Sequence, residues 1–251
     1  MRTCGVHKIL LSALAGFIVA VLSATAVVGI QKPHYNAGYQ AGYHAAHRYV
    51  PTRQIMVLTQ AAQLPTQGAV VLLGDSITDG MLPPANSGNL LNAGVSSAKV
   101  ADIPPLAKEI FAQVKPSVVL VTVGVNDAQK NGHFCLENLQ KEFRKICTIS
   151  PRYPTTHDVD DASRDVRLIL STVLPIARNM PLGDAYFDVE KIQQINAVIR
   201  TVADEENVEL LDAFTHFADS DGFLPREFTT DGVHLNAAGY EKWKELIMPL
   251  L

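Results

Sequence analysis

The stretch AVVLLGDSITDG, residues Ala69–Gly80, begins as an apolar run and ends in polar residues. From Ala69 to Leu73 it is continuously apolar, a pattern typical of a strand that is covered on both faces, as in a parallel sheet. The run stops at Gly74, and Asp75 and Ser76 follow at once. Ligands of open parallel sheets bind just beyond the carboxyl ends of the strands. The stretch therefore predicts a buried strand that presents a serine hydroxyl where a ligand would bind.

The rest of the chain alternates between short apolar runs and helical patterns. Further strands are predicted at LLNAG (90–94), SVVLVTV (117–123), VRLILST (166–172) and VELL (208–211). A helix is predicted over residues 189–206, because Asp188 is a good N-cap and apolar residues recur there at helical spacing. The last helix is predicted to start near Asn236. This alternation predicts an α/β domain with three layers.

A base is needed near Ser76, because a serine hydroxyl is a poor nucleophile until its proton is taken. The best candidate is His234, in the segment TTDGVHLNAAGY before the last predicted helix. Asp231 precedes it by three residues, so that in a turn its carboxylate can hold the imidazole through the second ring nitrogen. The three residues form a serine–histidine–carboxylate arrangement in the chain order Ser, Asp, His.

Acyl transfer also needs hydrogen-bond donors for the oxyanion. Gly94 ends the second predicted strand and presents a backbone N–H without a side chain in the way. Asn126 follows the third predicted strand, and its amide can donate. The backbone N–H of Ser76 is the third candidate donor. Asp75 and Asp79, which flank the serine, are interpreted as turn and hydrogen-bonding residues.

These motifs resemble those of the SGNH hydrolases, the GDSL-type esterase and lipase family. The blocks that match, in the family's order, are GDSITDG (74–80), NAGVSSAKVADI (92–103), GVND (124–127) and DGVHLNAAGY (231–240). The resemblance covers roughly residues 66–251. It implies a flavodoxin-like sheet of about five parallel strands flanked by helices, and catalysis without a metal or other cofactor. It also implies that Ser76 is the nucleophile, with Asp231 and His234 completing the triad.

The N-terminus carries an uncharged apolar run from Ile9 to Ile30, preceded by Arg2 and Lys8. It fits either a signal peptide cleaved after Ala26 or an uncleaved membrane anchor, and its length favours the anchor. Both interpretations place the rest of the chain outside the cytoplasm, in the periplasm or beyond. We therefore expect a signal anchor or signal peptide over residues 1–31, a membrane-proximal connector over 32–65 and a hydrolase domain over 66–251.

Composition narrows the possible partners. The formal net charge is −4 and the chain has no basic run interleaved with aromatic residues, which argues against binding to nucleic acid.

Cys135 and Cys147 could form a disulfide in an exported domain or remain two thiols on one helix. Residues 150–165 are polar and rich in aspartate, and are predicted to form an inserted surface loop. The oligomeric state stays open.

The function predicted is that of an exported serine esterase that acts on acyl esters of small molecules, glycans or lipids, with short-chain or acetyl esters favoured. Two alternatives are carried with it. The same triad could transfer an acyl group to a cell-envelope sugar, or the fold could serve as a non-catalytic envelope binding protein. The presence of Ser76, Asp231 and His234 together argues against the binding protein, which has no need of the three.

Overall fold

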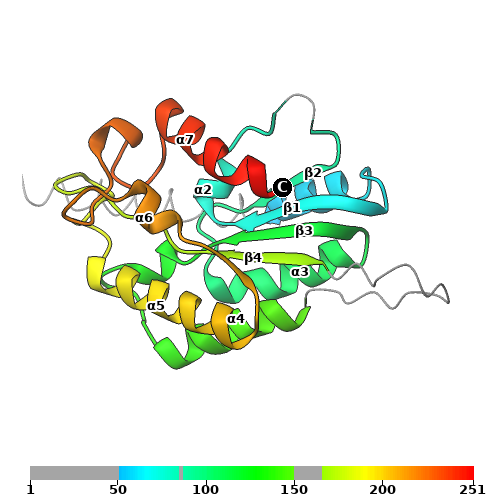
Figure 1. Ribbon diagram of the computed structural model, residues 1–251, viewed down its shortest axis with the longest axis horizontal. Helices are drawn as coiled ribbons and strands as arrows, with labels where there is room; N and C mark the ends of the chain where they lie inside the picture. The colour runs from blue at the N-terminus through cyan, green and yellow to red at the C-terminus, as the bar shows by residue number, and fades with distance from the viewer. Residues whose placement is uncertain (1–50, 85–86, 150–165) are drawn as a thin grey trace, which may run out of the picture. The chain divides into compact units, whose positions relative to one another are not determined.

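A five-stranded parallel sheet forms the centre of the protein (Figure 1). The computed structural model describes residues 51–84, 87–149 and 166–251. The strand order is β2-β1-β3-β4-β5, and every neighbouring pair is parallel. The strands are β1 (Gln67–Gly74), β2 (Leu90–Gly94), β3 (Lys115–Thr122), β4 (Arg167–Ser171) and β5 (Glu209–Leu211). The predicted α/β class and all of the predicted strands are confirmed.

Helices cover both faces of this sheet. One face carries α3 (Ile103–Phe111), α4 (Leu136–Ile149) and α5 (Val189–Glu205), and the opposite face carries α7 (Ala237–Ile247) (Figure 1). Shorter helical elements join the main ones: α2 (Ser76–Asp79), α6 (Ala213–Phe217), η1 (Val100–Asp102), η2 (Val125–Ala128), η3 (Arg226–Phe228) and η4 (Met248–Leu250). The result is the three-layer arrangement that the sequence predicts.

The two helices predicted from the sequence begin at the predicted caps. The Asp188 carboxylate accepts hydrogen bonds from the first backbone N–H groups of α5, and the apolar side of that helix is buried. The Asn236 side chain accepts from the N–H of Gly239 and caps α7 in the same way. Because Asn236 lies two residues after His234, this cap also fixes where the histidine loop ends.

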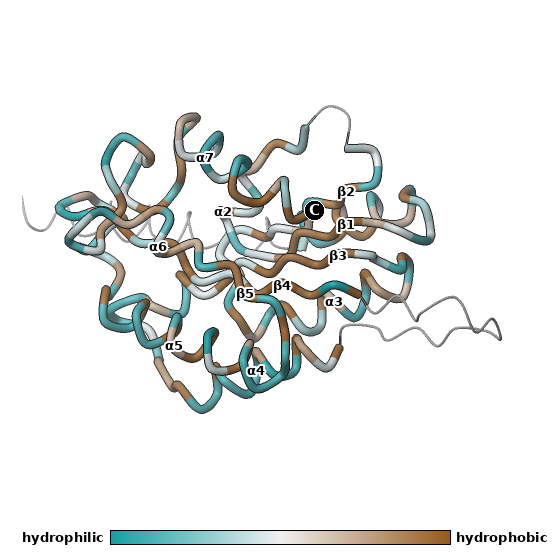
Figure 2. Tube along the Cα trace, viewed as in Figure 1, coloured by the Kyte–Doolittle hydropathy of each residue, from teal (hydrophilic) through white to brown (hydrophobic). Residues whose placement is uncertain are grey.

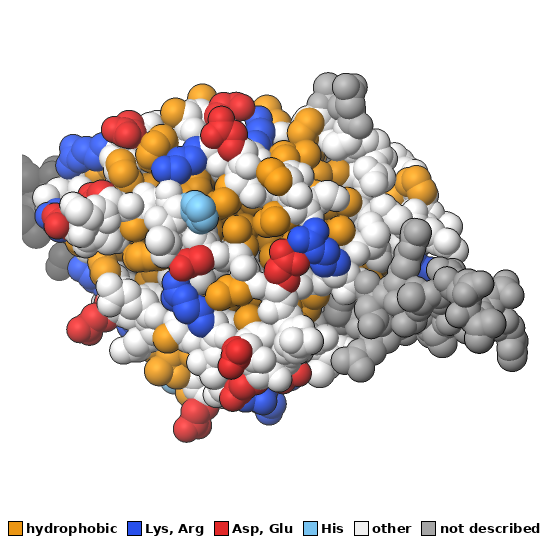
Figure 3. Space-filling view, in the orientation of Figure 1, with side chains coloured by type: hydrophobic (Ala, Val, Ile, Leu, Met, Phe, Trp, Pro, Cys, Tyr) orange, Lys and Arg blue, Asp and Glu red, His pale blue; other side chains and the backbone are white. Residues whose placement is uncertain are grey.

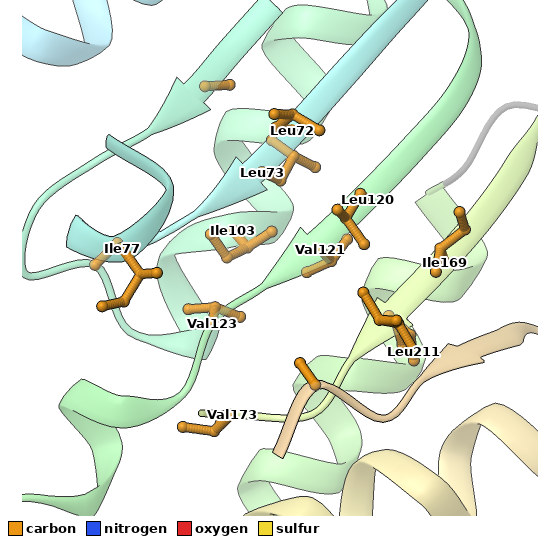
Figure 4. Close-up of a cluster of buried hydrophobic side chains, with 14 of the residues drawn as sticks. Leu72, Leu73, Ile77, Ile103, Leu120, Val121, Val123, Ile169, Val173 and Leu211 are labelled. Atoms are coloured by element: carbon orange, nitrogen blue, oxygen red, sulfur yellow. The ribbon is translucent and has the colours of Figure 1, made fainter. Parts of the chain in front are cut away.

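The core lies between the sheet and its helices. The middle strands are apolar along most of their length, whereas α4 and α5 are polar on their outer sides (Figure 2). Leu72, Leu120 and Ile169 come from three adjacent strands and are almost completely buried (Figure 4). Burial of a side chain of this size contributes about 1.5–3 kcal/mol. On the face shown in Figure 3, apolar side chains gather near the middle and charged ones lie around them.

A helix over residues 51–61 precedes the sheet and belongs to its compact unit, which spans Val50–Leu251. Val57 and Ala61 of this helix are buried in the common core. This helix therefore packs against the domain that the sequence places over residues 66–251. The chain before residue 51 lies outside the described residues, including the candidate anchor Ile9–Ile30 and most of the expected connector.

Two further sequence expectations concern α4 and its surroundings. Cys135, just before α4, and Cys147, near its end, are free thiols. Partial burial raises the pKa of the Cys147 thiol to about 11.

The expected loop over 150–165 lies outside the described residues. Within the part of the chain that is described, no helix combines the length and apolar character needed to cross a membrane.

Candidate active site

Ser76 is the first residue of α2, which starts directly where β1 ends. The Asp75 carboxylate caps this helix by accepting a hydrogen bond from the Ile77 N–H at 3.0 Å. Asp75 and Asp79, interpreted from the sequence as turn residues, lie at the two ends of this single helical turn. The serine thus sits at the carboxyl end of a central strand, as predicted.

Two glycines allow α2 to lie directly on the strand ends. A Cβ atom at Gly94 would collide with the backbone N–H of Asp79, the last residue of α2. A Cβ atom at Gly74 would collide with the Thr78 side chain and the Thr122 carbonyl. Any larger residue at either position would displace the helix that carries Ser76.

His234 and Asp231 complete a continuous hydrogen-bond chain to Ser76. The Nε2 atom of His234 is 3.0 Å from the Ser76 Oγ, and its Nδ1 atom is 2.6 Å from the Asp231 Oδ2. The serine and the histidine are 158 residues apart in the chain. The His234 side chain is 39% exposed, so the base remains accessible to solvent and to a ligand.

Hydrogen bonds within the loop that carries the histidine help to hold its backbone in place. Asp231 Oδ1 accepts from the backbone N–H groups of Val233 and His234, at 3.0 and 2.9 Å. The Thr229 hydroxyl donates to the His234 carbonyl and accepts from the Gly232 N–H. Gly232 has φ +110, in the left-handed region that favours glycine. The spacing of Asp231 and His234 therefore gives the geometry that the sequence predicts.

Asp231 is ionised at neutral pH. Burial alone would raise the pKa of its carboxyl, but the hydrogen bonds from the His234 ring and from two backbone N–H groups outweigh it and lower the pKa. An ionised carboxylate at Nδ1 keeps that nitrogen protonated and leaves Nε2 free to accept the proton of Ser76.

The three candidate oxyanion donors lie at, or just after, the ends of adjacent strands. Ser76 presents its N–H in the first turn of α2, where helix N–H groups lack partners within the helix. The Gly94 N–H donates to Asn92 Oδ1 at 3.0 Å. Asn126, in η2 after β3, donates from Nδ2 to the Ala98 carbonyl at 3.0 Å and keeps a second N–H for another acceptor.

Asn92 is a connection that the sequence interpretation misses. Its Nδ2 donates to the carbonyls of Thr78 and Met81, both at 2.7 Å, while its Oδ1 accepts from Gly94. This buried side chain therefore links the end of β2 to the helix of the nucleophile. A polar residue within the apolar run LLNAG is the signal that could have revealed it, because buried polar side chains need partners.

Asp75 and Asp79 differ from Asp231 in their surroundings. Asp75 is only 2% exposed, and burial raises the pKa of its carboxyl to about 7. Hydrogen bonds from Ile77 and Gly124 and the charge of His234 limit this rise in pKa. Asp79 Oδ2 accepts from the Ser96 hydroxyl at 2.7 Å. Because Asp231 is the carboxylate that binds the His234 ring, the geometry agrees with the interpretation of Asp75 and Asp79 as turn and hydrogen-bonding residues.

Tyr240 joins the histidine region to the helix of the nucleophile. Its hydroxyl donates to the Ile77 carbonyl at 3.0 Å. Burial, together with the nearby carboxylates of Asp75 and Asp79, raises the pKa of Tyr240 to about 12, so the hydroxyl stays a donor. A Cβ atom at Gly80 would collide with this hydroxyl, which explains the small residue there.

In the described ranges, acidic, histidine and cysteine side chains do not gather in threes as a metal site would require.

Known proteins share both the sequence pattern and the fold. A model of the GDSL-like lipase/acylhydrolase family matches residues 72–242. A GDSL-like lipase from Bacteroides thetaiotaomicron is 21% identical with a TM-score of 0.63, over 78% of this chain and 96% of that one. No curated protein sequence matches the chain.

Two further solved structures share the fold. The lipase/acylhydrolase from Enterococcus faecalis is 22% identical with a TM-score of 0.55, over 73% of this chain and 94% of its own. A variant of an acetyl xylan esterase from Geobacillus stearothermophilus is 20% identical with a TM-score of 0.53, over 74% of this chain and 96% of its own. At these identities the likeness shows the fold.

Proposed function

Because this chain belongs to the GDSL-like lipase/acylhydrolase family and is a carboxylic ester hydrolase, we propose that it cleaves short-chain or acetyl esters with Ser76 as nucleophile. The observation that carries the proposal is the unbroken hydrogen-bond chain from Ser76 through His234 to Asp231. This geometry fits a serine hydroxyl whose proton passes to an oriented imidazole.

The first half of the reaction forms an acyl-enzyme. His234 Nε2 takes the proton of Ser76 as Oγ attacks the ester carbonyl carbon, and the carbonyl oxygen becomes an oxyanion. The N–H groups of Ser76 and Gly94 and the amide of Asn126 stabilise that charge. The Gly94 N–H also donates to Asn92 Oδ1, so it shares its hydrogen between that oxygen and the oxyanion. The protonated histidine then gives its proton to the leaving alcohol, and the acyl group stays on Ser76.

The second half releases the acid. His234 Nε2 takes a proton from water, and the resulting hydroxide attacks the acyl carbon. The Ser76 oxygen leaves and recovers the proton from His234. The products are a carboxylic acid and the free serine, so the enzyme returns to its starting state.

The preference for acetyl or other short acyl groups rests on two supports. One solved protein with this fold is named as an acetyl xylan esterase. Among the described residues, those around Ser76 and His234 form short loops and a single helical turn, without a long apolar segment that would cover an extended acyl chain. Acetylated glycans are therefore the substrate class we favour.

The test is hydrolysis of a chromogenic ester series from acetyl to long-chain acyl, with wild type, Ser76→Ala and Ser220→Ala. Ser220 is an exposed serine and serves as the matched control. We expect turnover in wild type and Ser220→Ala that is highest for acetyl, and almost none in Ser76→Ala. Undiminished turnover in Ser76→Ala would remove Ser76 as nucleophile, and folded wild type inactive on every ester would favour acyl transfer to a specific acceptor.

We also propose that the hydrolase acts outside the cytoplasm, held by an uncleaved segment Ile9–Ile30. The apolar run and the positive charges that precede it support this placement. The mass of the mature protein in membrane and soluble fractions tests it. A soluble product that begins at Val27 would refute the anchor.

A further inference from the structure

Arg53, in the helix over residues 51–61, makes several charged contacts beside the candidate active site. Its Nε donates to the Gly94 carbonyl at 2.9 Å, and its second terminal nitrogen donates to the Asn92 carbonyl at 2.9 Å. Its Nε is also 2.9 Å from Asp79 Oδ1. The side chains of Arg53 and Asp79 are only 12% and 11% exposed. This burial makes the contacts stronger than those of a surface ion pair.

The first two contacts lie along the outer edge of the sheet. β2 is an edge strand, and its inner side pairs with β1, as the hydrogen bond from the Val95 N–H to the Gly74 carbonyl shows. Alternate residues of a strand direct their backbone groups to opposite sides. The carbonyls of Asn92 and Gly94 therefore lie on the unpaired side, where the guanidinium takes the place of a neighbouring strand.

This placement fixes the backbone on both sides of the Gly94 N–H. The Asn92 carbonyl belongs to the peptide unit that precedes the one containing the Gly94 N–H. The Gly94 carbonyl belongs to the peptide unit that follows it. With both carbonyls held by one planar guanidinium, the intervening N–H keeps a fixed direction. That N–H is a proposed oxyanion donor, whose value depends on being aligned before the reaction.

The contact with Asp79 also connects Arg53 to the helix that carries the nucleophile. Asp79 ends α2, the helix that begins with Ser76, and its other carboxylate oxygen accepts hydrogen bonds from Ser96. Arg53 thus touches both the strand that carries the oxyanion donor and the helix that carries the nucleophile. A displacement of about 1 Å between such groups can cost about 100-fold in rate.

We infer that Arg53 is a positioning residue for ester hydrolysis, which sets the Gly94 N–H relative to Ser76. The inference rests on the proposed function of these two residues. Arg53 lies before residue 72, where the family match starts, so this contribution comes from outside the matched range. A lysine could not replace it fully, because a single ammonium group lacks the planar fork that binds separate acceptors.

The test compares Arg53→Gln and Arg53→Lys with wild type on a chromogenic acetate ester, in the full chain. Arg167→Gln is the matched control, because the Arg167 guanidinium also binds a carboxylate, of Glu209, and a backbone carbonyl, of Leu250. We expect kcat to fall about 10- to 100-fold in Arg53→Gln with KM within about threefold of wild type. Arg53→Lys should lose less, and Arg167→Gln should keep the wild-type kcat.

Chemical rescue gives a readout that a general loss of stability would not produce. A hollow of about 460 Å³ is bordered by Arg53, Asp79 and Asn92, so a small guanidinium can reach the position left empty in Arg53→Ala. We expect methylguanidine to restore part of kcat in Arg53→Ala and to leave Arg167→Gln unchanged. Circular dichroism establishes whether each variant is folded. If Arg53→Gln and Arg53→Ala do not fold, the comparison of Arg53→Lys with wild type tests the inference.

The outcomes separate this inference from the proposed function. Wild-type kcat in folded Arg53→Gln, together with Ser76-dependent turnover in wild type, overturns the role of Arg53 alone. If wild type turns over no ester, the proposed substrate class is wrong. The Arg53 comparison is then made on the rate at which a fluorophosphonate labels Ser76, where equal rates in wild type and Arg53→Gln overturn it.

Discussion

The His234 ring is oriented by a carboxylate three residues away, whereas Gly94 is held by contacts that reach across the domain. On the base side, Asp231 binds both the ring and the backbone N–H of a residue three positions later. On the oxyanion side, Asn92 reaches 14 residues back to Thr78, and Arg53 reaches 41 residues forward to Gly94. Changes on the base side should therefore act on chemistry alone, while changes on the oxyanion side should also act on stability.

The largest expected effect is on the base side. Asp231→Asn keeps an oxygen for the backbone N–H groups but presents an amide to His234, which favours the wrong imidazole tautomer. We expect kcat to fall by about 10³- to 10⁴-fold with little change in thermal stability. Steady-state kinetics with an acetate ester measure this, and Asp221→Asn, at an exposed aspartate, is the control. A loss below tenfold would show that Asp231 does not orient the base.

Asn126→Ala tests the oxyanion side directly. Removal of one donor should lower kcat about 100- to 1,000-fold, with KM close to that of wild type. The bond to the Ala98 carbonyl is lost as well, so a lower melting temperature should accompany the loss of rate. Asn89→Ala, at an exposed asparagine just before β2, is the control. Unchanged turnover in folded Asn126→Ala would take Asn126 out of this role.

Asn92→Leu should separate the two sides by stability. The substitution leaves the carbonyls of Thr78 and Met81 and the Gly94 N–H without their buried partner. Each such group costs about 1–3 kcal/mol, so the free energy of unfolding should fall by about 3 kcal/mol or more. Urea denaturation measures the change. A decrease below about 1 kcal/mol would mean that Asn92 does not hold the two elements together.

Asp75 lies where the two sides meet, and the smallest expected effect is on its pH dependence. Burial raises its pKa in the folded protein from the ordinary value of 3.8 to about 7, so the folded state binds the proton more tightly. Its contribution to stability is therefore present at low pH and is lost as the pH rises through about 7. Between pH 5 and 7 the loss should be about 2 kcal/mol.

Asp75→Asn cannot titrate, so its free energy of unfolding should change less across this range than that of wild type. Urea denaturation of both proteins at pH 5 and pH 7 gives the comparison. Parallel profiles would show that Asp75 is not a buried carboxyl that stays protonated below neutral pH.

The sequence predicts the base side better than the oxyanion side, because Asp231 and His234 are close in the chain whereas the contacts around Gly94 are not. Strands are marked by continuous apolar runs, and the pairing of Asp231 with His234 depends on a spacing of three residues. Arg53 gives no such local signal, because its partners lie about 26 to 41 residues away, and only the parallel sheet brings them together. The sequence does not predict the helix over 51–61 either. Few of its residues, among them Val57 and Ala61, are apolar and buried.

The separation of 158 residues between Ser76 and His234 also has a consequence in time. At roughly 5–20 residues per second, synthesis of that interval takes on the order of ten seconds or more. Throughout it the emerging chain carries a serine without its base, and on the proposed mechanism it cannot attack an ester. On this mechanism hydrolysis begins only when the loop of His234 reaches Ser76, so the return of activity after unfolding reports the formation of that contact.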